Sequence, residues 1–593
     1  MSTSTVTPLV AASPLGRPLP FAPHAVSVSL PAWQDNVDYQ EYVPRVIDAM
    51  KTGYPRFFIH RSVQKLASMC ERKLGQEERA MLFPCSTYAN ACSDFILRNE
   101  PNASVRIVQF HICPPGTQST TISAPTSLKK EEINRQLVHG IDVYVVLFKQ
   151  EQWSLARAFW QHTGMGISSR LVEQCLHLLD PNASNVNGSA ASEESSVHGE
   201  NQSHSAKGLP EASSESTKRN DIRERIVGLI TEDVLEPNEK TYPDGGSSSR
   251  TRRVPNLSPE DVFLFPSGMC AIWHTHQLLL KVLGDQKSVC WGFPYVDTLK
   301  ILQKWGPGCF LFGHGDEFEE LEALLKTQKE AGTLSFLSFA NYEFAIVVDD
   351  TVGNYANVHV LPYADVVCTS FTKVFSGAAN VMAGGLILNP QGLFYQRLRP
   401  ILESSYEDTF WGEDALVLER NSRDFKSRVY KINETAEAVC DLLYAHSFEG
   451  QNPSNCQPTS SLTITKVPVI KKIYYPKWIT PDLYNSFKTP KGGFGGLFSV
   501  TFTCDTAAVA FYNALGCEKG PSLGTNFTLA CPFAVLAHWA ELEWARGYGV
   551  DPYLVRLSVG LEETEKVIGW IENALCAAEA AMMEQEKMVK PEV

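Results

Sequence analysis

Several features that would define a class of protein are missing from this chain. No apolar run reaches the roughly 20 residues needed to cross a membrane, and the first 20 residues, rich in Ser, Thr and Pro, lack the pattern of a leader. Basic side chains are in deficit, with 52 Lys and Arg against 66 Asp and Glu and a net charge of −14. This balance disfavours binding to nucleic acid or an anionic membrane. We therefore expect a cytoplasmic protein with neither kind of partner.

Paired cysteine motifs are lacking too. The 15 cysteines are scattered without C-x-x-C spacing, so we expect reduced thiols and no metal site. Apolar residues, in contrast, make up 44% of the 593 residues, which is enough for large hydrophobic cores and several domains.

The most informative stretch that is present is residues 370–373 (S-F-T-K), which follow an apolar run at 366–368. A lysine between small hydroxyl residues at a strand end is how a protein holds pyridoxal phosphate, because the amine condenses with the aldehyde while the hydroxyls take up phosphate oxygens. Taken alone, the pattern also fits a solvated lysine after a buried strand.

A second stretch agrees with the first. Residues 344–351 (F-A-I-V-V-D-D-T) form an apolar run that ends in two carboxylates and is typical of a strand buried on both faces of a parallel sheet. Ligands of open α/β sheets bind beyond the carboxyl ends of the strands. Asp349 would lie there and could pair with a pyridine nitrogen, whereas Asp350 fits a turn cap better.

A third stretch, residues 263–272 (F-L-F-P-S-G-M-C-A-I), predicts a strand, a glycine turn and a helix that continues to Leu280. Glycine at such a turn lets the backbone approach a phosphate, and the helix N-terminus supplies free amides and a positive dipole.

In chain order, phosphate turn, aspartate and lysine have the layout of a fold-type I pyridoxal phosphate enzyme. Residues 266–269, 348–351 and 370–373 resemble the Cys/Met-metabolism family, and within it the long fungal cystathionine γ-synthases. Further stretches that carry this resemblance are 53–60 (G-Y-P-R-F-F-I-H), 159–164, 406–409, 419–423, 520–525 and 555–562. Together they cover roughly residues 24 to 575.

The resemblance implies an α/β fold. Its large domain would be fold-type I (aspartate aminotransferase-like) with a mostly parallel seven-stranded sheet, and a small C-terminal α+β domain would follow. An N-terminal α/β extension would precede both. The cofactor implied is pyridoxal 5′-phosphate.

The resemblance also implies residue roles. Lys373 would be the Schiff-base lysine and proton shuttle, and Asp349 would bind the pyridine nitrogen. The phosphate would be held by the amides of Gly268 and Met269 and by the hydroxyls of Ser370 and Thr372.

Three more residues are implied in binding. Trp291 stands where relatives carry a tyrosine that stacks on the cofactor ring, and its indole offers a face but no phenol. Arg556 would grip the α-carboxylate of the amino-acid substrate, a task suited to a planar bidentate donor. Ser522 would line the same pocket.

The activity implied is γ-replacement of an O-acyl-L-homoserine with L-cysteine to give L-cystathionine, a trans-sulfuration step of methionine biosynthesis in a homodimer or homotetramer. Two alternatives stay open. One is a fungal enzyme that passes the same kind of intermediate to another nucleophile in secondary metabolism, and the other is a non-catalytic paralogue.

The non-catalytic reading arises from a short connection. If residues 334–339 and 344–348 are neighbouring parallel strands, about four residues join them, where a crossover needs a dozen or more. We favour the interpretation that about 20 residues are missing between positions 339 and 344; loss of the first strand and an antiparallel hairpin are the alternatives.

A second departure concerns a Y-x-R motif. In shorter relatives a neighbouring subunit contributes it to the phosphate site from a few tens of residues before the glycine turn. Residues 54–56 (Y-P-R) match the pattern but lie about 200 residues too early. We therefore assign no such donor.

Composition divides the chain into five parts. Residues 1–23 are predicted as a disordered tail, and residues 24–181 as the N-terminal extension. Residues 182–220, rich in Ser, Glu, Asn and Gly, are predicted as a disordered linker. Residues 221–400 would form the cofactor domain, and residues 401–593 a connecting helix with the small domain.

Overall fold

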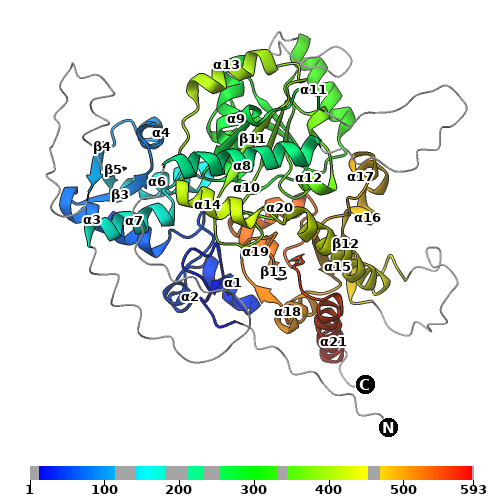
Figure 1. The fold of residues 1–593 in the computed structure, drawn as a ribbon. Helices are drawn as coiled ribbons and strands as arrows, with labels where there is room; N and C mark the ends of the chain where they lie inside the picture. The colour runs from blue at the N-terminus through cyan, green and yellow to red at the C-terminus, as the bar shows by residue number, and fades with distance from the viewer. Residues whose placement is uncertain are drawn as a thin grey trace, which may run out of the picture.

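The computed structural model describes residues 13–113, 140–180, 212–231, 254–330, 344–451 and 468–589. Within them the chain forms an N-terminal extension, a cofactor domain and a C-terminal small domain, which lie against one another (Figure 1). No helix in these ranges is long and apolar enough to cross a membrane.

The N-terminal extension, blue and cyan in Figure 1, is built around an antiparallel sheet of order β3-β5-β4. The elements are β3 (Glu78–Phe83), β4 (Val105–Ile112), β5 (Ile141–Lys149), α1 (Trp33–Gln40), α2 (Pro44–Ala49), α3 (Arg61–Leu74), α4 (Ser86–Asn99), α6 (Trp153–Thr163) and α7 (Ser169–Leu179).

The cofactor domain holds a four-stranded sheet of order β6-β11-β10-β9. Its strands are β6 (Val262–Phe265), β9 (Val347–Asp349), β10 (Val366–Thr369) and β11 (Gly384–Leu388). β11 is antiparallel to both its neighbours and β9 is parallel to β10, so β6, β9 and β10 run in one direction. The mostly parallel character expected of this sheet is present.

Two further strands, β7 (Ser288–Trp291) and β8 (Cys309–Phe312), form a separate parallel pair. The described residues thus hold six of the seven strands expected, and the predicted strand at 334–339 lies outside them. The helices of this domain are α9 (Gly268–Leu283), α10 (Val296–Lys304), α11 (Phe318–Glu330), α12 (Asn354–Asn357) and α13 (Tyr395–Ser405).

The small domain, yellow to red in Figure 1, contains a five-stranded sheet of order β12-β13-β16-β15-β14. Its strands are β12 (Ile470–Tyr474), β13 (Leu497–Phe502), β14 (Glu518–Lys519), β15 (Leu529–Pro532) and β16 (Val555–Ser558). The helices are α14 (Gly412–Asn421), α15 (Phe425–Ala445), α16 (Pro476–Ile479), α17 (Pro481–Phe487), α18 (Asp505–Ala514), α19 (Phe533–His538), α20 (Leu542–Gly547) and α21 (Thr564–Val589).

One hydrophobic core spans the extension and the cofactor domain. Buried side chains of the extension, Phe83, Tyr88 and Phe159 among them, pack in one cluster with Phe265 and Cys270 of the cofactor domain. Burial of large aromatic side chains contributes roughly 1.5–3 kcal/mol each. The extension is therefore part of the same folded body as the cofactor domain.

Two predicted disordered segments are partly ordered. Residues 13–23 lie in the predicted tail, yet β1 (Pro18–Leu19) pairs with β2 (Ser27–Val28) and Ser13 Oγ donates to Glu518 of the small domain. In the predicted linker, α8 (Ala212–Thr231) already begins at Ala212. It is fixed by isoleucines at a helical spacing that pack beneath β6: Ile222, Ile226 and Ile230.

Candidate active site

Asp349 and Lys373 lie at the same edge of the cofactor sheet. Asp349 ends β9 and is paired in register with Cys368 of the parallel strand β10, and Lys373 follows β10 by four residues. The carboxyl ends of parallel strands meet at one edge. The apolar runs before the two residues therefore bring a carboxylate and an amine to one place, as the sequence predicted.

The amine of Lys373 is buried and has a hydroxyl partner. The residue is 9% exposed, and Nζ donates to Ser522 Oγ at 3.1 Å. Burial lowers the pKa of Lys373, because desolvation disfavours the ammonium. Ser522 has φ of +100°, a strained conformation for a residue other than glycine. The backbone is held in this conformation where the serine meets the lysine.

The phosphate turn has the expected form. Ser267 caps α9, its Oγ accepting from the amide of Cys270 at 3.1 Å, and the first amides of a helix have no partner within it. A Cβ at Gly268 would come within 2.7 Å of the Cβ of Ser370. Only glycine lets the helix N-terminus approach Ser370 this closely, and Gly268 and Met269 offer their amides there.

The hydroxyl of Thr372 is already engaged. Its Oγ1 accepts from the amide of Ala383 at 2.9 Å and donates to the carbonyl of the same residue at 3.2 Å. Thr372 is also almost fully buried. These contacts stiffen the turn that carries Lys373, so Thr372 fits the predicted role of phosphate ligand less well than Ser370.

Asp349 is linked to the phosphate side of the site by Thr351. Thr351 Oγ1 donates to Asp349 Oδ1 at 2.6 Å and accepts from the amide of Ser370 at 2.9 Å. Two hydrogen bonds through Thr351 therefore connect Asp349 to the backbone of Ser370 and fix the relative position of these two predicted cofactor contacts.

Arg556 lies on β16 and has no carboxylate partner among the described residues. Its Nε is 3.5 Å from Ser499 Oγ, and its guanidinium carbon lies 3.4 Å from the ring centroid of Phe533. A half-buried arginine without an ion pair is costly to desolvate. The arrangement suits the predicted role of binding a substrate carboxylate.

Trp291 is placed less favourably. The side chain is 38% exposed, and its indole packs beside Phe312 and Phe318. Within the ranges described it makes no ring contact with Lys373 and no hydrogen bond with Asp349. The stacking of this indole on a cofactor ring stays a prediction.

Tyr54 and Arg56 reach the site, although their place in the sequence predicted no such role. The ring centroid of Tyr54 lies 4.2 Å from Nζ of Lys373. Arg56 Nη1 donates to Asp297 Oδ2 at 2.6 Å and to the carbonyl of Gln161 at 2.9 Å. These residues were excluded because about 200 residues separate them from the glycine turn in the sequence. The extension packs against the cofactor domain, so this separation does not keep them from the site. The sequence signal that could have identified them was the resemblance of residues 53–60 to the family.

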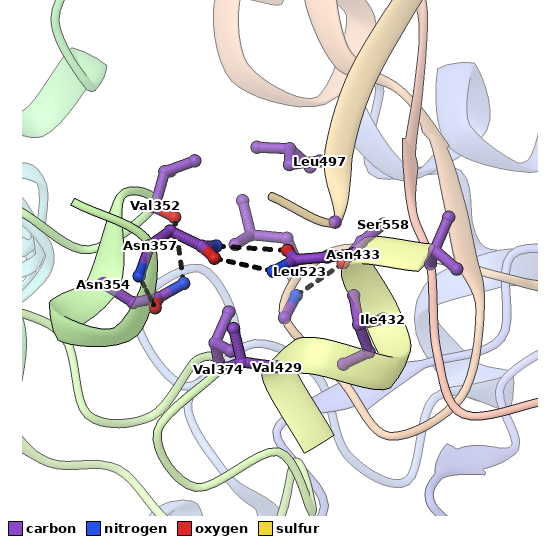
Figure 2. A pocket seen from close by; sticks show the side chains of 13 residues that line it. Val352, Asn354, Asn357, Val374, Val429, Ile432, Asn433, Leu497, Leu523 and Ser558 are labelled. Atoms are coloured by element: carbon purple, nitrogen blue, oxygen red, sulfur yellow. Dashed lines mark hydrogen bonds between the residues drawn. The ribbon is translucent and has the colours of Figure 1, made fainter. Parts of the chain in front are cut away.

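A small cavity behind the site joins the cofactor and small domains (Figure 2). At its wall Asn357 of α12 and Asn433 of α15 exchange two amide hydrogen bonds, of 2.7 and 3.2 Å. Close by, the amide of Gly524 donates to Ser558 Oγ at 2.7 Å. These bonds fix the loop carrying Ser522 and the segment after Asp349 against the small domain.

The fold and the site define a class that comparison with known proteins identifies. Residues 62–168 match the family described as fungal trans-sulfuration enzyme, N-terminal domain, and residues 338–576 match Cys/Met metabolism PLP-dependent enzyme. The chain belongs to this family of pyridoxal phosphate-dependent enzymes.

Individual relatives agree over the whole chain. A cystathionine γ-synthase-like enzyme of Amanita muscaria is 41% identical, covering 98% of this chain and 99% of the relative. A cystathionine γ-synthase of Neurospora crassa is 36% identical, covering 95% and 98%. The solved structure of cystathionine γ-synthase from Xanthomonas oryzae pv. oryzae is 20% identical with a TM-score of 0.43, covering 61% of this chain and 99% of that chain.

The alignments are longer than this chain. The comparison with the Amanita muscaria enzyme runs over 642 positions, whereas the chain has 593 residues. At least 49 of these positions therefore have no residue here. The predicted short connection between 339 and 344 lies outside the described residues.

Pyridoxal 5′-phosphate is the cofactor of this family, and the site fits it on three observations. The amine of Lys373 is buried with a lowered pKa, as condensation with an aldehyde requires. Gly268 brings a helix N-terminus close to Ser370, which suits a phosphate. Asp349 presents a carboxylate at the same sheet edge.

Proposed function

We propose that this enzyme catalyses γ-replacement. The acyloxy group at Cγ of an O-acyl-L-homoserine is exchanged for the thiol sulfur of L-cysteine, which gives L-cystathionine and the free acid. The observation that carries the proposal is the buried amine of Lys373, bonded to Ser522 at the sheet edge that also bears Asp349. The Neurospora crassa relative, a cystathionine γ-synthase, supports this choice of reaction.

Lys373 is the base and acid of the proposed reaction. Bound pyridoxal phosphate supplies an electron sink that makes protons on the substrate acidic. The neutral amine of Lys373 takes the proton from Cα and serves again at Cβ, after which the C–O bond at Cγ breaks. A lowered pKa keeps the amine available as a base nearer to neutral pH.

The other residues bind and orient. The Asp349 carboxylate holds the pyridine nitrogen, while the amides of Gly268 and Met269 and the hydroxyl of Ser370 hold the phosphate. Arg556 binds the α-carboxylate, since its guanidinium has no carboxylate partner in the described ranges. Ser522 orients the lysine and lines the pocket of the same carboxylate.

A second candidate reaction shares every step until the nucleophile adds. The Amanita muscaria relative is named as cystathionine γ-synthase-like, and a carbon nucleophile or sulfide in place of cysteine would use the same residues. The pairing of Lys373 with Ser522 favours neither acceptor. The choice rests on the groups that bind the second substrate.

Product analysis tests the proposal. The purified, cofactor-loaded protein is offered O-acetyl- and O-succinyl-L-homoserine in turn, each with cysteine, with sulfide and with a carbon nucleophile. We expect cystathionine in the cysteine reactions. Turnover only with another nucleophile would favour the second candidate, and no release of acid from either ester would refute both.

We further propose that the enzyme works in the cytoplasm, in the methionine pathway, as a homodimer or homotetramer. Sedimentation of the loaded protein measures the assembly, and methionine auxotrophy on deletion tests the pathway. A sedimenting monomer, or growth without methionine, would contradict the corresponding part.

A further inference from the structure

A loop of the N-terminal extension closes over the reactive lysine. Tyr54 is 6% exposed, and its ring face lies 4.2 Å from Nζ of Lys373, a distance at which an ammonium is attracted to an aromatic face. Lys373 follows β10 and Tyr54 precedes α3, so two segments more than 300 residues apart in the chain meet at one amine.

The loop is anchored inside the protein by Arg56. This residue is 3% exposed and forms a buried ion pair with Asp297, the second residue of α10. It also donates to the carbonyl of Gln161 on α6 and contacts the hydroxyl of Tyr295. Removing one partner of a buried ion pair leaves the other charge buried without compensation, which is strongly destabilising. Tyr54 is therefore held in place by contacts within a single chain.

The charges around Tyr54 prepare it to exchange a proton. Burial acts to raise the pKa of Tyr54, but the charges of Lys373 and Arg56 outweigh it and lower that pKa below its ordinary value. The pKa of Lys373 is lowered as well, by burial. Both groups thus move toward neutral pH, where proton transfer between positioned groups is most effective.

We propose that the phenol of Tyr54 is the proton-exchange partner of Lys373, and that it comes from the same chain as the lysine. An N–H bond of the Lys373 ammonium breaks and the O–H bond of Tyr54 forms, which leaves the amine neutral with its electron pair free. The reverse transfer returns the proton. Arg56 is a positioning residue. The inference rests on the proposed function and adds a catalytic residue from the N-terminal extension.

The first test uses cofactor uptake and needs no substrate. The cofactor-free protein is mixed with pyridoxal phosphate over a series of pH values, and the rate of gain of visible absorbance is recorded. Tyr54 raises the pKa of Lys373, so Tyr54→Phe should move the midpoint of the pH profile to lower pH. The exposed Tyr42 of the same extension gives the control, Tyr42→Phe, which should leave the midpoint unchanged.

Uptake also separates this inference from the proposed reaction. If the midpoint moves while no acyl homoserine is consumed, the role of Tyr54 stands and the reaction is wrong. If the midpoint of a folded Tyr54→Phe protein equals that of the wild type, the role of Tyr54 is refuted. Where the reaction holds, loss of Tyr54 should lower kcat by about 100-fold or more, with KM for the ester little changed.

The second test asks which chain supplies Tyr54. Two differently tagged chains, one Tyr54→Phe and one Lys373→Ala, are co-expressed and the hybrid assembly is isolated. Only the first chain can take up cofactor. We expect its uptake midpoint to equal that of the Tyr54→Phe protein. A midpoint like that of the wild type would mean that the neighbour donates Tyr54, and would overturn the assignment to one chain. If the wild-type protein is a monomer and no hybrid forms, a shifted midpoint in the Tyr54→Phe protein by itself assigns the tyrosine to the same chain.

Discussion

Three surroundings act on the amine of Lys373: burial, the hydroxyl of Ser522 and the ring of Tyr54. Burial disfavours the ammonium and lowers the pKa of Lys373, whereas Tyr54 acts to raise that pKa. The Ser522 hydroxyl holds the amine in place by a hydrogen bond.

The first prediction at this scale concerns the lysine itself. Lys373→Ala should abolish the visible absorbance of the protein with pyridoxal phosphate, because no other predicted contact forms a covalent bond to the aldehyde. Absorbance after gel filtration measures it. Lys326→Ala, at an exposed lysine of α11, should behave as the wild type. A fully coloured Lys373→Ala protein would move the reactive lysine elsewhere.

The second concerns Arg556. Arg556→Ala should raise KM for the acyl homoserine by roughly 10- to 100-fold, the value of charge-assisted hydrogen bonds worth about 1.5–3 kcal/mol. Bound cofactor should be unaffected. The matched control is Arg546→Ala, whose guanidinium pairs with Glu543 at the surface. Loss of cofactor in the Arg556→Ala protein would assign that arginine to the structure and not to the substrate.

At the scale of the element, the strands and the helix that form the site are those the sequence predicted. The apolar runs at 344–348 and 366–368 end in β9 and β10, and the glycine turn leads into α9. β6 and β10 are buried along their whole length, as their apolar runs predict. The run at 344–348 was predicted to be buried on both faces, but β9 is the edge strand of the sheet among the described residues, and Val347 is 40% exposed there.

What sequence reasoning missed depends on contacts between distant segments. The hydrogen bonds of Thr372 with Ala383 and the ring contacts of Trp291 could not be read from the sequence, and the cofactor roles of both residues stay predictions. Residues 212–220 have a linker-like composition, yet α8 is stabilised by its isoleucines against the cofactor sheet. Tyr54 was excluded from the site because it lies about 200 residues before the glycine turn, but the folded extension brings it to Lys373.

The pair of amide hydrogen bonds between Asn357 of α12 and Asn433 of α15 gives a prediction about stability. Asn357→Ala removes both amide bonds to Asn433 and leaves that amide buried without its partner. We expect the free energy of unfolding to fall by about 1–3 kcal/mol, measured by chemical denaturation. Asn102→Ala on the exposed surface is the control. Equal stability of the two variants would contradict a structural role for the asparagine pair.

The connection between positions 339 and 344 gives a prediction about cofactor binding. Inserting about 20 residues there, the length that a crossover with a helix needs, should increase the fraction of protein that gains visible absorbance with pyridoxal phosphate. The same insert at the exposed turn after β8 should not. Equal absorbance with and without the insert at 339–344 would mean that the short connection is sufficient.

At the scale of the whole molecule, the extension and the cofactor domain share one core and several buried polar contacts. Ser267 Oγ donates to the carbonyl of Gly164, and Arg56 of the extension forms a buried ion pair with Asp297 of α10. Separation would expose the large aromatic cluster around Phe159 and Phe265.

This predicts the result of a cut between the two parts. A protease site placed within residues 182–211 and cleaved in the folded protein should yield two fragments that still elute together and keep the visible absorbance. Residues 212–593 expressed alone should be insoluble or bind no cofactor. Fragments that separate at micromolar concentration would contradict a shared core.

The shared core also orders events during synthesis. The apolar face of β3 and α4 leaves the ribosome well before Phe265 and α9, against which it packs. About 170 further residues must be translated before β6 is complete, which takes roughly 9–34 s at 5–20 residues per second. Throughout that interval the nascent extension presents aromatic surface to its surroundings. We therefore expect the chain to complete its fold only late in translation, and chaperones to bind the exposed N-terminal part until then.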